Sequence, residues 1–148
     1  TITLGNLDAK RDWGFSKEYV EVIWKILQLP SPDDFVIATE ETHSIRDFLR
    51  EAFLLVSLNY KDFLIISDQY KRPADVPALL GDSTKVRKVL DWKPKVKFKK
   101  LIHMMLAADI KTKFEQSGIV PVDPQNKNSD DLYIEKGIEL AQKLRKHQ

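Results

Sequence analysis

Short runs of β-forming residues alternate with amphipathic helical stripes along this chain, and this alternation constrains its fold more than any other feature. The β-forming runs are Thr1–Leu4, Asp34–Ala38 and Phe63–Ile66. Apolar residues recur at helical spacing within 16–27, 45–56, 83–90, 98–110 and 130–146. We therefore predict an α/β arrangement with a few short strands and four to five helices. Because helices flank Asp34–Ala38, we expect this run to be a buried strand in parallel pairing.

Composition allows a single domain and excludes several kinds of site. The chain has 148 residues, of which 43% are hydrophobic, enough for one core. Its 24 basic and 22 acidic residues give a net charge of +2, which does not by itself indicate nucleic acid. The absence of cysteine excludes disulfides and thiolate metal sites.

The ends and the apolar runs of the sequence lead to further expectations. No run approaches the roughly 18 apolar residues of a membrane span, and no signal-peptide pattern opens the chain. We expect a cytoplasmic protein with neither a membrane nor a nucleic-acid partner. Thr1 opens directly into a β-forming run, which predicts a piece of a longer protein. Residues 116–129 are polar and contain two prolines, so we predict a linker between a domain at 1–115 and a helix or partly ordered tail at 130–148.

The loop from Tyr70 to Asp82 contains the densest functional signal. Proline fixes φ and disfavours the α region for the residue before it, so Pro73 and Pro77 predict a shaped loop. Arg72 offers a planar fork of donors suited to phosphate, and Asp75 offers acceptors suited to hydroxyl groups. Two interpretations remain open. The pair reads a phosphorylated sugar or nucleotide, or Arg72 and Asp75 pair with each other across a surface turn.

Two other groups of charged residues also allow alternatives. Arg11 beside Trp13 is an anion-binding arm, or belongs to a surface strand on which Trp13 packs inward while Arg11 and Asp12 are solvated. From Lys85 to Lys100 there are eight basic residues against one acid. We expect a solvated face there, because the nearby aromatics, Trp92 and Phe98, are better used in a core than in stacking on bases.

The helical stripe at 45–56 has a recognisable start. Ser44-Ile-Arg-Asp47 matches a capping box with Asp in place of Glu. His43 stands just ahead of it, and the chain offers no second ligand at metal spacing. We interpret His43 as a loop or cap residue and predict no metal site.

Several segments resemble one known family in amino-acid sequence and in spacing. They are Leu4-Gly-Asn-Leu-Asp-Ala-Lys-Arg-Asp-Trp-Gly14, Asp34-Phe-Val-Ile-Ala-Thr39, Tyr70-Lys-Arg-Pro-Ala-Asp-Val76, Leu80-Gly-Asp82 and Trp92-Lys-Pro94. Together they resemble the C-terminal half of GDP-mannose 4,6-dehydratases, which belong to the extended short-chain dehydrogenase/reductase superfamily. The resemblance covers roughly Leu4 to Ala108.

The resemblance implies roles for five residues. Arg11 and Arg72 match the arginines that grip the pyrophosphate of the sugar nucleotide. Asp75 matches the acid that contacts the ribose, although relatives usually have Glu there. Thr3 and Leu4 match the wall beside the base. A further departure is Phe15, where relatives have histidine.

The resemblance also implies what this chain lacks. It contains no Gly-x-Gly-x-x-Gly fingerprint and no Tyr-x-x-x-Lys, which lie in the preceding Rossmann half of the resembled enzymes. We therefore expect no catalytic and no cofactor-binding residue here, and NADP bound by the missing half. The implied enzyme is an NADP-dependent lyase of GDP-fucose biosynthesis that converts GDP-mannose to GDP-4-keto-6-deoxymannose and water, and is a homo-oligomer when complete. Alone, the 148 residues should be inactive.

Two alternatives to this function remain open. One is another nucleotide-sugar epimerase or reductase of the same superfamily. The other is a non-catalytic interaction module that binds an anionic partner through the basic face at 85–100.

Overall fold

A computed structural model of the chain describes residues 1–117 and 129–145. Within this part the prediction of few short strands and up to five helices is confirmed. The elements are β1 (Ile2–Leu4), β2 (Lys10–Arg11), α1 (Ser16–Ile26), β3 (His43–Ser44), α2 (Ile45–Leu55), β4 (Leu64–Ile66), α3 (Thr84–Leu90), α4 (Phe98–Gln116) and α5 (Ser129–Arg145), with short 3-10 turns η1 (Tyr60–Asp62) and η2 (Asp68–Tyr70). None of these helices is long and apolar enough to cross a bilayer.

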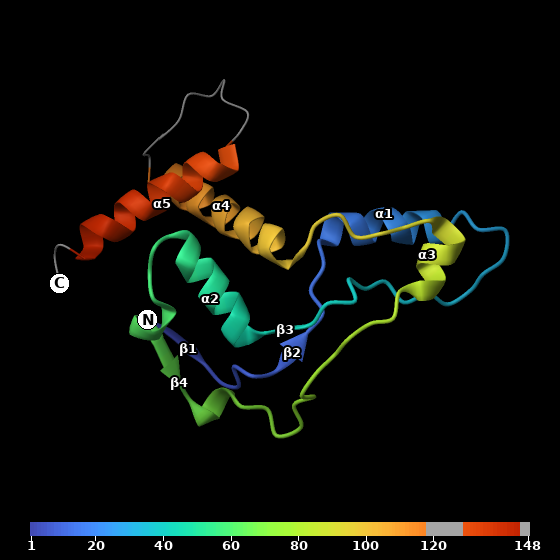
Figure 1. The fold of residues 1–148 in the computed structure, drawn as a ribbon, viewed down its shortest axis with the longest axis horizontal. Coiled ribbons are helices and arrows are strands. Elements are labelled where there is room, and N and C mark those ends of the chain that lie inside the picture. The colour runs from blue at the N-terminus through green and yellow to red at the C-terminus, as the bar shows by residue number, and fades with distance from the viewer. Residues whose placement is uncertain (118–128, 146–148) are drawn as a thin grey trace.

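The strands form two small, separate ladders. β1 runs parallel to β4 with Thr3 opposite Ile65, and β2 runs antiparallel to β3 with Arg11 opposite His43. Both ladders lie below α2 in Figure 1, and the long loop after β4 passes close to β2. Lys10 joins that loop to β2, because its N–H donates to Pro77 O at 2.8 Å and its O accepts from Leu79 N at 3.0 Å. The two ladders and the loop thus enclose one corner of the molecule.

The predicted strand at Asp34–Ala38 is wrong. This segment is not assigned to any strand, and no described strand pairs with it. Its side chains still alternate, with Phe35 and Ile37 packed toward α1 and α3 while Val36 is 54% exposed. A β-forming run needs a neighbouring strand for its N–H and C=O groups, and the described residues offer none beside it.

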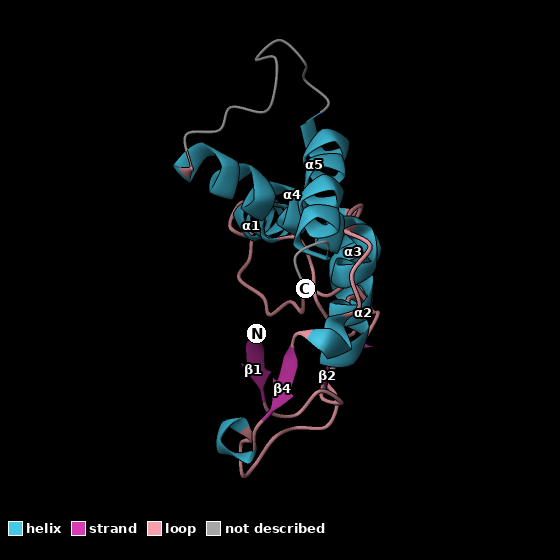
Figure 2. Ribbon diagram, turned by 90° about the vertical axis from the view of Figure 1, so that its left-hand side faces the viewer, coloured by secondary structure: helices cyan, strands magenta, loops and turns pink. Residues whose placement is uncertain are grey.

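Two apolar clusters stabilise the fold at opposite ends. Val22 of α1 and Val86 of α3 are fully buried and pack with Trp92. At the other end α4 and α5 lie side by side (Figures 1 and 2). There Ala107 and Phe114 of α4 pack against Tyr133 and Ile134 of α5. The expected core roles of Trp92 and Phe98 are confirmed, since both are buried.

The C-terminal helix docks on α4 rather than standing apart. Besides the apolar cluster, His103 Nε2 lies 3.0 Å from Asp131 Oδ1 across the two helices. Residues 118–128 of the predicted linker lie outside the described residues, so the division into 1–115, 116–129 and 130–148 stays a prediction.

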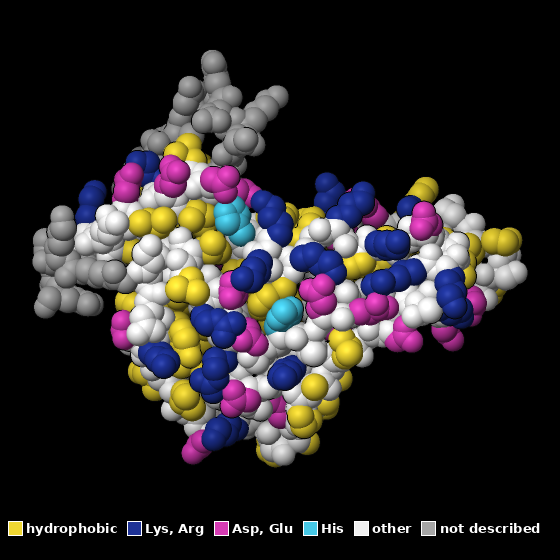
Figure 3. Space-filling model, viewed as in Figure 1, with side chains coloured by type: hydrophobic (Ala, Val, Ile, Leu, Met, Phe, Trp, Pro, Cys, Tyr) yellow, Lys and Arg dark blue, Asp and Glu magenta, His cyan; other side chains and the backbone are white. Residues whose placement is uncertain are grey.

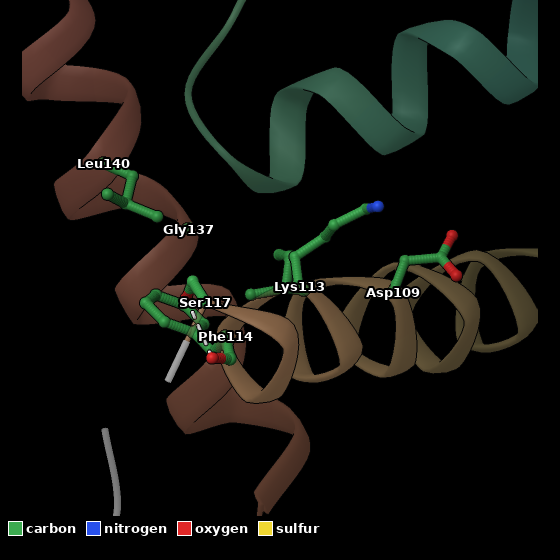
Figure 4. A pocket seen from close by; sticks show the side chains of 7 residues that line it. Asp109, Lys113, Phe114, Ser117, Gly137 and Leu140 are labelled. Carbon is green, nitrogen blue, oxygen red and sulfur yellow. Dashed lines mark hydrogen bonds between the residues drawn. The ribbon is translucent and has the colours of Figure 1, made fainter. Parts of the chain in front are cut away.

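A hollow of about 360 Å³ lies between α4 and α5 (Figure 4). Ile110 and Phe114 of α4 face Gly137 and Leu140 of α5 around it, and the Ser117 hydroxyl donates to Phe114 O at 2.8 Å beside it. Its lining is almost wholly apolar. It has no convergent polar groups that would orient a substrate, so it lacks the features of a substrate site.

α2 begins with the predicted capping box, which is confirmed. Asp47 N donates to Ser44 Oγ at 3.0 Å, and Ser44 N donates to Asp47 Oδ2 at 3.1 Å. The Ser44 hydroxyl is the largest cause of a lowered pKa of Asp47. Ser44 also ends β3, so the same residue fixes the start of α2 and the strand opposite Arg11. His43, one residue earlier, stacks on Phe98 with ring centroids 3.7 Å apart.

Glu40 has an unusual backbone conformation and compensating side-chain bonds. Its φ of 61° lies in the left-handed region, which costs a non-glycine residue about 1 kcal/mol. Its Oε1 accepts from Ser83 N and Ser83 Oγ at 3.0 and 2.8 Å, and its Oε2 lies 2.8 Å from Arg87 Nη2. Glu40 therefore ties the segment before β3 to α3.

Glu40→Ala should lower the free energy of unfolding by about 1–2 kcal/mol, because it leaves the buried Ser83 without its acceptor. The backbone strain at this position is the same in Glu40→Ala as in the wild type. Glu40→Gly removes the same bonds but relieves the strain, so it should cost about 1 kcal/mol less. Urea unfolding of both variants measures the difference. Equal losses would show that the φ of Glu40 is not strained.

Candidate functional site

A pocket of about 260 Å³, lined by both polar and apolar groups, lies where β1, β2 and the loop after η2 meet. Four of the five residues implied by the resemblance line it, namely Leu4, Arg11, Arg72 and Asp75. Thr3 is exposed on β1 and is not among the lining residues. The pocket's remaining lining comes from Gly5, Asn6, Ala9, Ile45 and Tyr70.

The pocket forms because β1 and the loop after β4 approach closely. The two parallel strands end side by side, where Ser67 N donates to Leu4 O at 2.9 Å. At Gly5 an added Cβ would lie 2.3 Å from Tyr70 O, so only glycine permits this approach. This contact brings Arg72, two residues after Tyr70, beside the end of β1.

Arg11 is held in place by the chain around it. Its Nη1 donates to Lys10 O and to Val76 O, each at 2.8 Å, and its Nη2 lies 2.7 Å from Asp75 Oδ1. The interpretation that Arg11 is solvated is therefore wrong. The interpretation that Arg72 and Asp75 pair with each other is also wrong. Asp75 pairs instead with Arg11, which is 64 residues away.

The neighbours of Arg11 are also packed rather than solvated. Trp13 packs inward as one interpretation predicted, stacked on Phe98 at 5.7 Å between ring centroids. Asp12, expected to be solvated, instead accepts from Thr39 N at 2.9 Å, Glu40 N at 3.0 Å and Gly81 N at 3.4 Å. β2 is thus fixed on both sides of Arg11, which limits the movement of its guanidinium.

The charges at the pocket favour an anion. Two guanidinium groups face one carboxylate, and Arg72 is exposed with no ion pair to another described residue. The pKa of Asp75 is lowered from 3.8, first by the hydrogen bond from Asn6 and then by Arg11. Asp75 is therefore ionised at neutral pH, and the pocket has a net charge of about +1. Such a site can accept a phosphate or diphosphate through charge-assisted hydrogen bonds.

Sequence reasoning missed five lining residues, and two of them, Asn6 and Tyr70, have polar side chains. Asn6 follows β1 and Gly5, and its Nδ2 donates to Asp75 Oδ2 at 2.9 Å. Tyr70 lines the pocket beside Arg72. No spacing rule connects positions 6 and 75, so only the fold reveals this contact.

Half of the eight cations of the basic face at 85–100 are neutralised by ion pairs. Four of its cations lie beside carboxylates, in the pairs Lys85–Asp33, Arg87–Glu40, Lys97–Glu41 and Lys99–Glu51. Figure 3 shows basic and acidic side chains interleaved across this side of the molecule. The pairing weakens the alternative of a module that binds an anionic partner through this face.

Comparison with known proteins supports the sequence resemblance. The sequence profile of the family described as "GDP-mannose 4,6 dehydratase" matches residues 1–105. GDP-mannose 4,6 dehydratase 2 of Arabidopsis thaliana is 50% identical over 107 residues, which is 72% of this chain and 29% of the relative. The human GDP-mannose 4,6 dehydratase is 42% identical over 125 residues, covering 73% of this chain and 34% of the relative. The chain thus spans about a third of the length of these relatives.

A solved structure resembles the fold. RMD from Pseudomonas aeruginosa, complexed with NADPH, superposes with a TM-score of 0.61 at 16% identity, covering 72% of this chain and 34% of that one. The chain thus has part of the α/β fold of the short-chain dehydrogenase/reductase class. Within that class it belongs to the GDP-mannose 4,6-dehydratase family.

Proposed function

We propose that this chain is the sugar-nucleotide-binding part of a GDP-mannose 4,6-dehydratase. The observation that supports it most is the convergence of Arg11 and Arg72, 61 positions apart in the sequence, on one pocket. GDP would place its diphosphate between the two guanidinium groups. The base would lie against the end of β1, where Leu4 lines the pocket and Thr3 stands next to it.

The pocket binds the diphosphate of the substrate and does not contain the reaction centre. A diphosphate is remote from the hexose carbons at which dehydration occurs. Binding energy gained at this remote group can hold the hexose in the geometry that the reaction requires. The lining residues offer no pair of groups for proton transfer to a sugar, since Asp75 is engaged with Arg11 and Asn6.

The described residues do not fit the NADP that the family implies. A dinucleotide cradle needs a glycine-rich turn between a strand and a helix whose N-terminus faces the pyrophosphate. β1 is followed by Gly5, but no helix begins there, and the backbone of Tyr70 fills the space beside that glycine. We propose that the cofactor and the catalytic groups belong to the part of the enzyme that this chain does not include.

The outer face of α1 supports an incomplete fold. Val20, Ile23, Trp24 and Leu27 share that face, with Trp24 63% and Leu27 75% exposed. Val36, on the extended segment that lacks a strand partner, is exposed as well. An exposed apolar stripe with an unpaired β-forming run nearby is typical of a surface that packs on further structure. The missing part of the enzyme is its expected occupant.

Two measurements test the proposed function. The 148 residues with GDP-mannose and NADP⁺ should show no turnover, and robust turnover would contradict the assignment of a binding role alone. GDP should raise the melting temperature of the same chain, since a ligand that binds only the folded state stabilises it. UDP should have a smaller effect. A stronger response to UDP would favour another nucleotide-sugar epimerase or reductase, and no response to either would overturn the proposal.

A cytoplasmic location and a homo-oligomeric complete enzyme belong to the same proposal. Light scattering on the complete enzyme after size-exclusion chromatography measures its oligomeric state.

A further inference from the structure

Both oxygens of the Asp75 carboxylate accept hydrogen bonds from side chains at the pocket. Its Oδ1 lies 2.7 Å from Arg11 Nη2, and its Oδ2 accepts from Asn6 Nδ2 at 2.9 Å. The side chain of Asp75 is only 19% exposed. Each oxygen thus accepts one hydrogen bond, one from a guanidinium and one from an amide, and the two bonds together turn the carboxylate toward Arg11 and Asn6.

Arg11 is fixed by Asp75 together with two main-chain oxygens. Lys10 O and Val76 O take both hydrogens of Nη1, and Asp75 takes one hydrogen of Nη2. The other Nη2 hydrogen and the Nε hydrogen have no acceptor among the described residues. These two hydrogens remain for the oxygens of a ligand, on a guanidinium that cannot swing away without breaking three bonds.

Asn6 fixes the orientation of Asp75. Asp8 N donates to Asn6 Oδ1 at 2.9 Å, so the oxygen end of the amide faces the main chain and the nitrogen end faces Asp75. A flipped amide would lose this bond and place its oxygen against a carboxylate. One favourable arrangement of donors and acceptors therefore exists for this series of hydrogen bonds, which runs from Asp8 N through Asn6 and Asp75 to Arg11.

We propose that Asn6 and Asp75 are positioning residues that hold Arg11 ready for a diphosphate, and that Asp75 does not contact the ribose in this chain. The inference builds on the proposed function, because it assigns how the diphosphate is recognised. A fixed guanidinium loses less side-chain freedom on binding than a mobile one.

The test compares ligands with and without ribose hydroxyls. Binding of inorganic pyrophosphate, GDP and 2′,3′-dideoxy-GDP to the 148-residue chain is measured by calorimetry for wild type, Asn6→Ala and Asp75→Asn. In Asn6→Ala, loss of the hold on Arg11 should weaken all three ligands by the same factor, about three- to tenfold. In Asp75→Asn the removal of a negative charge offsets part of that weakening, and the change should again be the same for all three ligands. Asp68→Asn is the matched control, because Asp68 is exposed in η2, pairs with Lys71 and does not line the pocket. It should change binding less than twofold.

Each other outcome overturns a specific statement. If Asp75→Asn weakens GDP but leaves dideoxy-GDP and pyrophosphate unchanged, Asp75 is a ribose contact and the inference fails. If wild type binds neither GDP nor pyrophosphate, the proposed function fails. The positioning of Arg11 is then decided without ligand, by the ¹⁵Nε signal of Arg11 in NMR spectra. Asn6→Ala should shift and broaden that signal, and an unchanged signal would overturn the positioning role.

Discussion

Arg72→Ala is expected to weaken GDP binding to this chain by about 10- to 50-fold. Charge-assisted hydrogen bonds contribute about 1.5–3 kcal/mol, and the exposure of Arg72 keeps its contribution in the lower part of that range because solvent screens it. Arg72 lines the pocket, is exposed and has no ion pair to another described residue. Its charge acts on Asp75 from a distance, but no hydrogen bond to another described residue holds its guanidinium, so Arg72→Ala should leave folding almost unchanged.

Calorimetric titration with GDP measures the effect, and thermal unfolding checks that the variant is folded. Arg50→Ala is a matched control, because Arg50 lies on α2, pairs with Asp47 and does not line the pocket. Both variants lose one positive charge, so any general electrostatic effect appears equally in both. Wild-type affinity for GDP in Arg72→Ala would remove Arg72 from the site.

The same reasoning separates Arg72 from Arg11. Arg11 also bridges Lys10 O and Val76 O, so truncating it would loosen the loop as well as remove a charge. A loss of binding in Arg11→Ala therefore has two causes, whereas a loss in Arg72→Ala has one. Arg72 is for this reason the cleaner test of the proposed diphosphate site.

Local sequence rules predicted the elements whose stability is local. The capping box at Ser44 and Asp47 needs only residues three positions apart, and α2 begins there. The stripe from Phe98 likewise predicted α4, although that helix continues to Gln116. The same rules failed at Asp34–Ala38, because a strand depends on a neighbour that may lie anywhere in the sequence, or outside this chain.

At the site, too, sequence patterns did not predict contacts between residues that are far apart in the sequence. The resemblance placed Arg11, Arg72 and Asp75 in one functional group, and the fold brings them to one pocket. It could not show that Asp75 faces Arg11, or that Asn6 holds Asp75, since these contacts span 64 and 69 positions. Which acceptor a guanidinium meets is decided by the close approach of two segments, not by the spacing within either.

That close approach can be tested at Gly5, where substitution should have the largest effect on stability. In Gly5→Ala the new Cβ would lie 2.3 Å from Tyr70 O, 2.5 Å from Tyr70 C and 2.9 Å from Lys71 N. All three are main-chain atoms, so no side chain can rotate away and the loop itself must move. Overpacking of this kind costs about 1–3 kcal/mol, which for a chain of this size lowers Tm by roughly 3–10 °C.

The same movement should weaken GDP binding, because Arg72 lies two residues beyond Tyr70 and moves with it. Gly137→Ala is the matched control. Its new Cβ would lie 2.8 Å from Ile110 Cδ1 and 3.0 Å from Val56 Cγ1, which are side-chain atoms and not main chain, and alanine favours the helix α5. Calorimetric unfolding with and without GDP should therefore show a large loss of stability and of ligand response for Gly5→Ala, and little change for Gly137→Ala. If Gly5→Ala kept both wild-type Tm and wild-type affinity, the approach of β1 to the Arg72 loop would not define the pocket, and the convergence of Arg11 and Arg72 would need another cause.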